Sequence, residues 1–183
     1  MLITPSQLLD ESLQIDQTFA PGVIDFGEIV RQIGSLPVKG DADLITEHRG
    51  PKEVVYDIRL RAGYIGNFEM LCARCVEPVQ RPLNQQFDLI FRPADADAVT
   101  GEHAITPDDT EIGYYEQSGL LLEDVLREQV LLSLPDRVLC KPDCKGLCPR
   151  CGQNLNQEAC SCDAAPVDSR WNALADLADR IKK

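Results

Sequence analysis

The feature that most restricts how this chain can fold is a cysteine-rich segment near its end, residues 139–163. It contains six of the eight cysteines: Cys140, Cys144, Cys148, Cys151, Cys160 and Cys162. Its centre, Cys148-Pro149-Arg150-Cys151-Gly152, has the form of a zinc knuckle. In such a turn two thiolates reach one metal ion, and the following glycine lets the backbone fold back under the sulfur atoms. Cys160 and Cys162 can return two more thiolates, so the spacing predicts a closed, structural four-thiolate zinc site. A disulfide framework and unpaired core cysteines are the alternatives.

A second Cys-x-x-Cys pair, Cys72-Ala73-Arg74-Cys75, lies far from this segment in the sequence. If the last four cysteines of the chain fill one site, Cys140 and Cys144 remain in the segment. Together with Cys72 and Cys75 they supply the four ligands of a second site. We therefore predict two zinc ions per chain. The first site is formed by Cys148, Cys151, Cys160 and Cys162, and the second by Cys72, Cys75, Cys140 and Cys144.

Other interpretations of the second pair stay open. Cys72 and Cys75 can be two thiols in a tight turn, or a thioredoxin-type redox pair. A redox pair normally lies at a helix N-terminus, where the dipole lowers the thiol pKa. The run Val76–Val79 looks extended, which disfavours the redox interpretation. A different partition of the six later cysteines is also open, because spacing alone does not determine connectivity.

The residues before the second pair predict an antiparallel β-sheet of three or more strands. From residue 54 to residue 62, apolar side chains alternate with a second set that includes Asp57, Arg59 and Arg61, which is the period of a strand with one buried face. Gly63 and Gly66 predict a bend or a bulge, after which the chain runs extended into the cysteine pair. A similar alternation follows the pair at residues 87–92, and residues 38–45 read as an edge strand.

One amphipathic helix is predicted over Gly119–Leu134, with Ser118 in a position to cap it and Pro135 to end it. Its apolar stripe is expected to pack on the sheet as core. The predicted fold class is therefore α+β. It has a body over residues 1–135, with an acidic loop at 93–113. A zinc-binding module over residues 136–183 packs on the body and ends in a shorter helix, Trp171–Ile181.

Charge divides the chain into two parts. Residues 1–135 carry 10 Lys and Arg against 23 Asp and Glu, whereas residues 136–183 carry 8 against 7. Phosphate backbones repel an acidic body, so a broad nucleic-acid surface is disfavoured and a basic protein partner suits the charge better. The plainer alternative is that the acidity only confers solubility. Near the predicted zinc sites, Lys141, Lys145, Arg150 and Arg170 can offset the thiolate charge; in the alternative interpretation the first three contact the phosphates of an RNA.

The sequence contains no HExxH, P-loop, GxGxxG or GxSxG motif. His48 and His103 have no nucleophile-like neighbour in sequence. We therefore predict no catalytic residue and no small-molecule substrate, and we expect a protein that is not an enzyme. No signal peptide or membrane-spanning run is visible, and eight cysteines in that context predict a reducing cytoplasm.

Several motifs together resemble the YceD family (DUF177), described as large ribosomal RNA subunit accumulation proteins. They are the run Leu71–Pro78, the helix LLLEDVLREQVLLSLP, the segment Cys-x3-Cys-Lys-Gly-Leu-Cys-Pro-x-Cys-Gly-x-Asn-Leu-Asn and the terminal Asp-Ser-Arg-Trp-x-Ala-Leu-Ala-Asp-Leu. The resemblance covers the chain from about Val38 onward. It implies a bacterial cytoplasmic factor for 23S rRNA accumulation and large-subunit biogenesis.

The same resemblance implies a partner, a large-subunit precursor, which the protein would contact through its 23S rRNA or through a basic ribosomal protein. It implies no catalytic residue. Two alternative functions stay open. One is a chaperone or carrier of a basic ribosomal protein. The other, less favoured, is an enzyme, such as a Cys-x-x-Cys thiol oxidoreductase.

Overall fold

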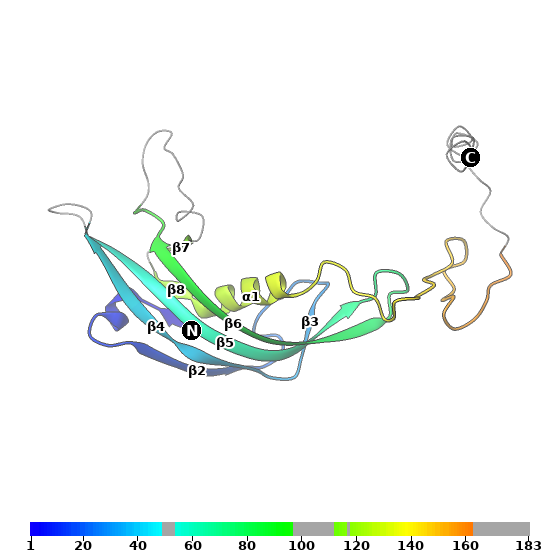
Figure 1. The fold of residues 1–183 in the computed structure, drawn as a ribbon, viewed down its shortest axis with the longest axis horizontal. Coiled ribbons are helices and arrows are strands. Elements are labelled where there is room, and N and C mark those ends of the chain that lie inside the picture. The colour runs from blue at the N-terminus through cyan, green and yellow to red at the C-terminus, as the bar shows by residue number, and fades with distance from the viewer. Residues whose placement is uncertain (49–53, 97–111, 117, 163–183) are drawn as a thin grey trace, which may run out of the picture.

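The computed structural model describes residues 1–48, 54–96, 112–116 and 118–162, which are the coloured parts of Figure 1. The predicted helix Trp171–Ile181 and most of the predicted acidic loop, residues 97–111, lie outside the described residues. Within the described part, the chain forms a large sheet, a two-stranded sheet, a short 3-10 helix (η1, Pro5–Leu8) and one α-helix.

The large sheet has the strand order β2-β4-β5-β6-β7, and β3 pairs with β5. Its strands are β2 (Leu13–Phe19), β3 (Arg31–Ile33), β4 (Leu36–His48), β5 (Val54–Leu71), β6 (Pro78–Pro93) and β7 (Ile112–Tyr115). The short strand β3 pairs with β5 at residues 67–69, next to the part of β5 that pairs with the start of β4. All pairings are antiparallel except that of β7, which runs parallel to β6. The predicted antiparallel sheet is therefore confirmed in its main part. The strand predicted at residues 38–45 is confirmed as part of β4, but its predicted position at the edge was wrong, because β4 lies between β2 and β5.

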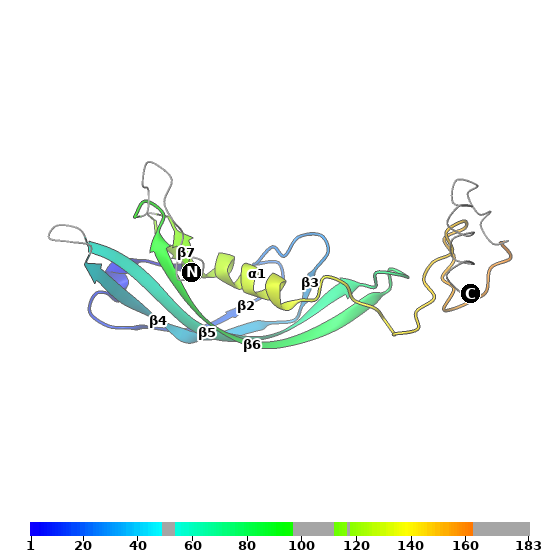
Figure 2. The same ribbon diagram turned by 45° about the horizontal axis from the view of Figure 1, so that its top comes forward.

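Strands β5 and β6 form a long hairpin, of 18 and 16 residues. Their register is continuous from Ile58↔Phe91 to Leu71↔Pro78, so the bulge predicted at Gly63 or Gly66 is absent from this pairing. Gly66 instead allows close packing, because a Cβ there would lie 2.7 Å from Leu36 Cδ1. Figures 1 and 2 show the hairpin as a curved ribbon that extends past the end of the helix. The cysteine pair between the two strands thus lies at the far end of the molecule's body.

The helix, α1, spans Leu122–Ser133 and so begins three residues later than predicted. The preceding residues, Leu120 and Leu121, form strand β8, which pairs with β1 (Leu2–Ile3). Ser118 is not the N-cap, since this position belongs to Leu121. Instead of a side-chain cap, the N–H of Leu122 donates to the carbonyl of Met1 at 3.0 Å. Among the described residues, no helix is long and apolar enough to cross a membrane.

The core lies between α1 and one face of the sheet, as predicted. The helix buries Leu122, Val125, Leu126 and Val130 against alternate residues of β5, including Ile58, Leu60, Tyr64 and Phe68. The Tyr64 hydroxyl donates to the carbonyl of Gln129 at 3.0 Å, in the second half of the helix. This contact holds that half of α1 against the sheet, and the chain that follows continues to the hairpin turn, where the Ala73 N–H donates to the Val138 carbonyl at 2.9 Å.

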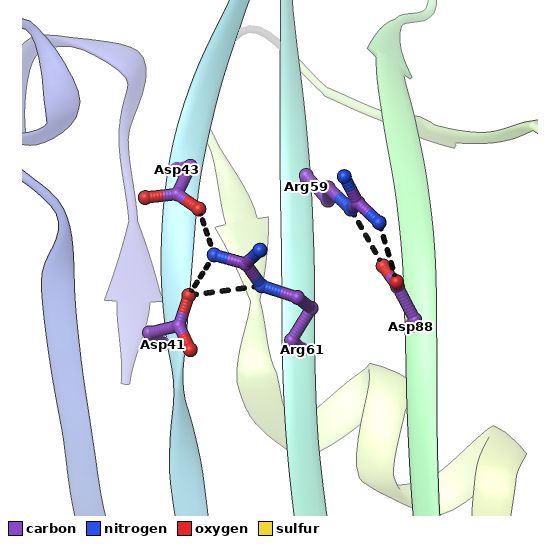
Figure 3. A network of polar contacts seen from close by, with 5 residues as sticks. All are labelled: Asp41, Asp43, Arg59, Arg61 and Asp88. Carbon is purple, nitrogen blue, oxygen red and sulfur yellow. Dashed lines mark hydrogen bonds and ion pairs between the residues drawn. The ribbon is translucent and has the colours of Figure 1, made fainter.

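The opposite face of the sheet carries a network of ion pairs across three strands, drawn in Figure 3. Arg59 of β5 donates two hydrogen bonds to the carboxylate of Asp88 on β6, at 2.8 and 2.6 Å. Arg61, two residues further along β5, pairs with Asp41 and Asp43 of β4. The cations of this network are therefore already matched by carboxylates of the same protein.

Candidate metal centres

The first candidate centre, here called the hairpin cluster, joins two distant parts of the chain. Cys72 and Cys75 come from the turn between β5 and β6, and Cys140 and Cys144 from the segment after α1. One sulfur from each residue lies within 4.8 Å of all the others. The Sγ atoms of Cys72 and Cys144 are 3.8 Å apart, and those of Cys75 and Cys140 are 3.5 Å apart. Tetrahedral zinc with Zn–S bonds of about 2.3 Å requires S···S separations of about 3.8 Å, so these distances fit such an ion.

Backbone hydrogen bonds shape the hairpin turn around its sulfurs. The N–H of Val76 donates to the carbonyl of Cys72 at 2.9 Å, and the N–H of Cys72 donates to the carbonyl of Glu77 at 2.8 Å. This turn requires a left-handed backbone conformation at the residue after the second cysteine, and Val76 adopts this conformation with φ 62°. The prediction of an extended run over Val76–Val79 was therefore wrong at Val76, but it is confirmed at Pro78 and Val79, with which β6 begins.

The thiols of the hairpin cluster differ in pKa. Burial raises the pKa of the Cys72 thiol, but backbone N–H groups, first that of Arg74, outweigh it and lower the pKa to about 6. Burial and hydrogen bonding to Cys75 raise the pKa of Cys140 to about 12. Four thiolates at these separations repel one another, so a divalent cation is needed for all four to ionise together.

The second candidate centre, here called the tail cluster, is local in sequence. It consists of Cys148, Cys151, Cys160 and Cys162, with one sulfur from each within 4.8 Å of the others. Gly152 has φ 75°, and its N–H donates to the carbonyl of Cys148 at 2.9 Å, as Val76 does in the hairpin turn. Backbone N–H groups of this turn, first that of Cys151, lower the pKa of Cys148 to about 6, whereas hydrogen bonding to Cys151 and then burial raise that of Cys162 to about 12.

Asn156 connects the hairpin cluster to the segment that carries the tail cluster. Its side-chain amide donates to the sulfur of Cys144 at 3.3 Å, and its carbonyl oxygen accepts the N–H of Lys145 at 2.9 Å. Burial acts to raise the pKa of the Cys144 thiol, but hydrogen bonds, first that from Asn156, outweigh it and lower the pKa. Sequence reasoning did not select this residue. The available signal was the pair of asparagines, Asn154 and Asn156, shortly after the knuckle, since polar groups next to metal ligands commonly hydrogen-bond to them and orient them.

The tip of the hairpin provides further contacts with the same segment. The N–H of Leu147 donates to the carbonyl of Arg74 at 3.0 Å. The carboxylate of Glu77 accepts hydrogen bonds from Asn154 at 3.1 Å and Gln157 at 3.2 Å. The residues just before and after the tail-cluster knuckle are thus held against the hairpin turn.

The structure brings together the same two groups of four cysteines that counting along the sequence separated. Both tetrads are placed to hold a metal ion. A four-thiolate tetrahedron favours zinc or iron and leaves no coordination position for a substrate. Lys141, Lys145 and Arg150 are exposed beside the ligands and form no side-chain ion pair within the described ranges. Both interpretations of these cations stay predictions.

Comparisons with known proteins identify the family. The family model described as large ribosomal RNA subunit accumulation protein YceD matches residues 61–178. Uncharacterized proteins of Mycobacterium tuberculosis and Mycobacterium bovis are each 34% identical over 106 residues, which is 58% of this chain and 48% of theirs. The chloroplastic large ribosomal RNA subunit accumulation protein YCED homolog 1 of Arabidopsis thaliana is 31% identical over 58 residues, 32% of this chain and 18% of its own.

The chain thus spans about half the length of the mycobacterial relatives. No solved structure matches it. The family model covers well over half of the chain and includes all eight cysteines of the two clusters. This chain therefore belongs to the YceD family.

Proposed function

We propose that this protein is a non-enzymatic factor of the cytoplasm that supports 23S rRNA accumulation during assembly of the large ribosomal subunit. Membership of the YceD family suggests a role in accumulation of this RNA. The observation that carries the proposal is that the family match, residues 61–178, spans β6, α1 and both cysteine clusters. The part of the chain that resembles the family is thus the part in which the metal centres are assembled.

We further propose that both clusters hold zinc and that both ions are structural. The S···S separations of 3.8 and 3.5 Å in the hairpin cluster support a tetrahedral thiolate site. Because its ligands come from the β5–β6 turn and from the segment after α1, zinc there would hold the module, residues 136–183, against the body, residues 1–135. Zinc in the tail cluster would fold the module itself.

The net charge of the protein indicates whether it contacts RNA or protein in the precursor. The chain has a formal charge of −12 with neutral thiols, and two zinc tetrathiolates would bring it to about −16. Phosphate would be repelled, and the cations of the outer sheet face are engaged in ion pairs. This favours contact with a protein component of the precursor. It also supports the alternative function, a carrier of a basic ribosomal protein that affects the RNA indirectly.

The thiol oxidoreductase alternative has one observation in its favour, the pKa of about 6 at Cys72. A metal-binding thiolate needs the same property. Cys72 and Cys75 are 1% and 4% exposed, and their turn connects two strands rather than beginning a helix. Turnover of a dithiol substrate by the zinc-free protein, lost in Cys72→Ser, would favour the redox alternative over ours.

Sedimentation of cell lysate through a sucrose gradient tests the proposed function. We expect the protein to migrate with large-subunit precursors at low salt and to be released at high salt, since screening weakens contacts between charged surfaces. Depletion of the protein should lower 23S rRNA relative to 16S rRNA. A protein that stays at the top of the gradient at both salt concentrations, in cells whose 23S rRNA is unaffected by depletion, would contradict the proposal.

A further inference from the structure

Strand β2 forms one border of the large sheet, and among the described strands it pairs with β4 alone. It runs along the lower border of the sheet in Figure 1. Its seven residues pair with β4 in an unbroken register, from Leu13↔Ala42 to Phe19↔Leu36. Within the described ranges no strand pairs with its other edge. Proteins usually protect such an edge with proline, lysine, a bulge or a very short strand, and β2 has none of these.

The N-terminal part of the chain, which contains this strand, is acidic. Residues 1–30 contain no Lys or Arg and five carboxylates: Asp10, Glu11, Asp16, Asp25 and Glu28. Asp16 forms an exposed ion pair with Lys39 of β4, and the other four make no ion pair with any described residue. Exposed apolar side chains lie in the segments that precede and follow the strand: Leu9, 61% exposed, and Val23, 57% exposed.

We propose that the outer edge of β2 binds an extended segment of a basic protein as an additional strand. An incoming segment would pair with the free N–H and C=O groups of β2, and cationic side chains would meet the carboxylates around it. Charge distinguishes this occupant from two others. RNA would be repelled by these carboxylates, and a second copy of this chain would bring two acidic edges together.

The inference rests on the proposed function in one respect, because an assembling large subunit supplies basic proteins as partners. It is otherwise independent of the family match, since β2 lies before residue 61, where the match begins. It names the surface and the chemistry of the partner, which the family resemblance does not.

Backbone hydrogen exchange of the full-length, metal-loaded protein tests the inference. The probe is a synthetic peptide that alternates Lys and Val and is long enough to match the seven residues of β2. Controls are a peptide that alternates Glu and Val and a single-stranded RNA. We expect the Lys–Val peptide alone to slow exchange, and only at those β2 amides that exchange freely in its absence.

Two proline substitutions make a matched pair. Gln14 and Gln17 are both exposed, and because their positions differ by an odd number their N–H groups point to opposite edges of β2. The exchange of the free protein shows which N–H points outward. Proline at that position should abolish peptide binding without lowering Tm, whereas proline at the other should remove a bond to β4 and lower Tm.

A charge variant tests whether the carboxylates near β2 attract the cationic peptide. Asp10→Lys with Glu11→Lys should weaken binding of the Lys–Val peptide about fivefold at low salt and leave Tm unchanged. Equal binding of the Glu–Val peptide or the RNA, or protection elsewhere than β2, would overturn the inference. Concentration-dependent protection of β2 without peptide would assign the edge to a second copy instead.

Failure of the inference can be told apart from failure of the proposed function. If the outward proline variant still migrates with large-subunit precursors, the inference is wrong and the function stands. If the wild-type protein neither migrates with precursors nor affects 23S rRNA, the function is wrong. Peptide binding at β2 is then decided by hydrogen exchange alone.

Discussion

The two cysteine clusters should differ sharply in how much their metal stabilises the body. Cys140 of the hairpin cluster and Cys151 of the tail cluster are both exposed, so replacing either with serine has little cost in packing. Each substitution removes one of four ligands. Any difference between the two variants therefore reflects what the respective metal holds together.

The magnitude follows from the loops that the two centres close. Cys75 and Cys140, whose sulfurs are 3.5 Å apart, are separated by 65 residues. A cross-link over a loop of that length lowers the entropy of the unfolded chain by an amount worth about 4 kcal/mol at 25 °C. This value counts only the loop closed between the two halves of the hairpin cluster. For a protein of this size it corresponds to a decrease in Tm of about 10 °C.

The tail cluster closes only a short loop outside the sheet. We expect Cys151→Ser to lose one metal ion and to leave the unfolding of the body almost unchanged. Cys140→Ser should lose one metal ion and lower the Tm of the body. It should also speed hydrogen exchange at the Ala73 N–H, which bonds Val138, and at the Leu147 N–H, which bonds Arg74.

The measurements are calorimetric unfolding of both variants and their zinc content by mass spectrometry, after purification without oxygen. Two zinc ions in the wild type and one in each variant are the expected counts. The reasoning is refuted if the two variants lower Tm equally, or if Cys140→Ser loses its metal with no change in Tm. Zinc content of one or less in the wild type would refute the two-site assignment itself.

Three further predictions concern contacts away from the sulfurs. Gly146→Ala should destabilise the cysteine-rich segment more than Gly152→Ala, measured by hydrogen exchange. Both glycines have positive φ, but only a Cβ at Gly146 meets another part of the chain, the Arg74 carbonyl at 3.0 Å. Asp57→Ala should cost about 2 kcal/mol in urea unfolding, because it removes the buried carboxylate that pairs with Arg92, a side chain 8% exposed that still pairs with the more exposed Glu47. Asp88→Ala, in an exposed pair with Arg59, should cost far less. Hydrogen bonding to Arg59 lowers the pKa of Asp88, so the stabilisation from this carboxylate is present at neutral pH and is lost as the pH falls through the lowered pKa. In an acid titration, the stabilities of the wild type and of Asp88→Asn should therefore converge there. A difference in stability that persists in strong acid would contradict this prediction.

Several features of this protein could be predicted from residue type and spacing alone. The alternation before Cys72 predicted β5, and the apolar stripe after residue 119 predicted α1 and its buried face. Both signals are local, since a strand or helix with one buried face repeats its pattern within a few residues. The grouping of the cysteines into two sets of four could also be predicted, because tetrahedral thiolate sites use ligands in fours and the knuckle motif assigns one set.

Other features depend on residues that meet only in the folded chain. The start of α1 was misplaced because Leu120 and Leu121 pair with β1. The role of Asn156 depends on the position of Cys144 in the folded cluster. The left-handed Val76 follows from the hydrogen bonds of its turn, against the preference of a β-branched residue.

The sequence by itself thus determined which side chains can bind metal and which segments alternate or repeat with a helical period. These properties belong to single residues and their near neighbours. The tertiary structure alone decided that Leu120 and Leu121 pair with β1, that Asn156 contacts Cys144, and that among the described strands β2 has one unpaired edge. Such relations join residues far apart in the chain, and their free energy arises only when the sheet and helix pack together.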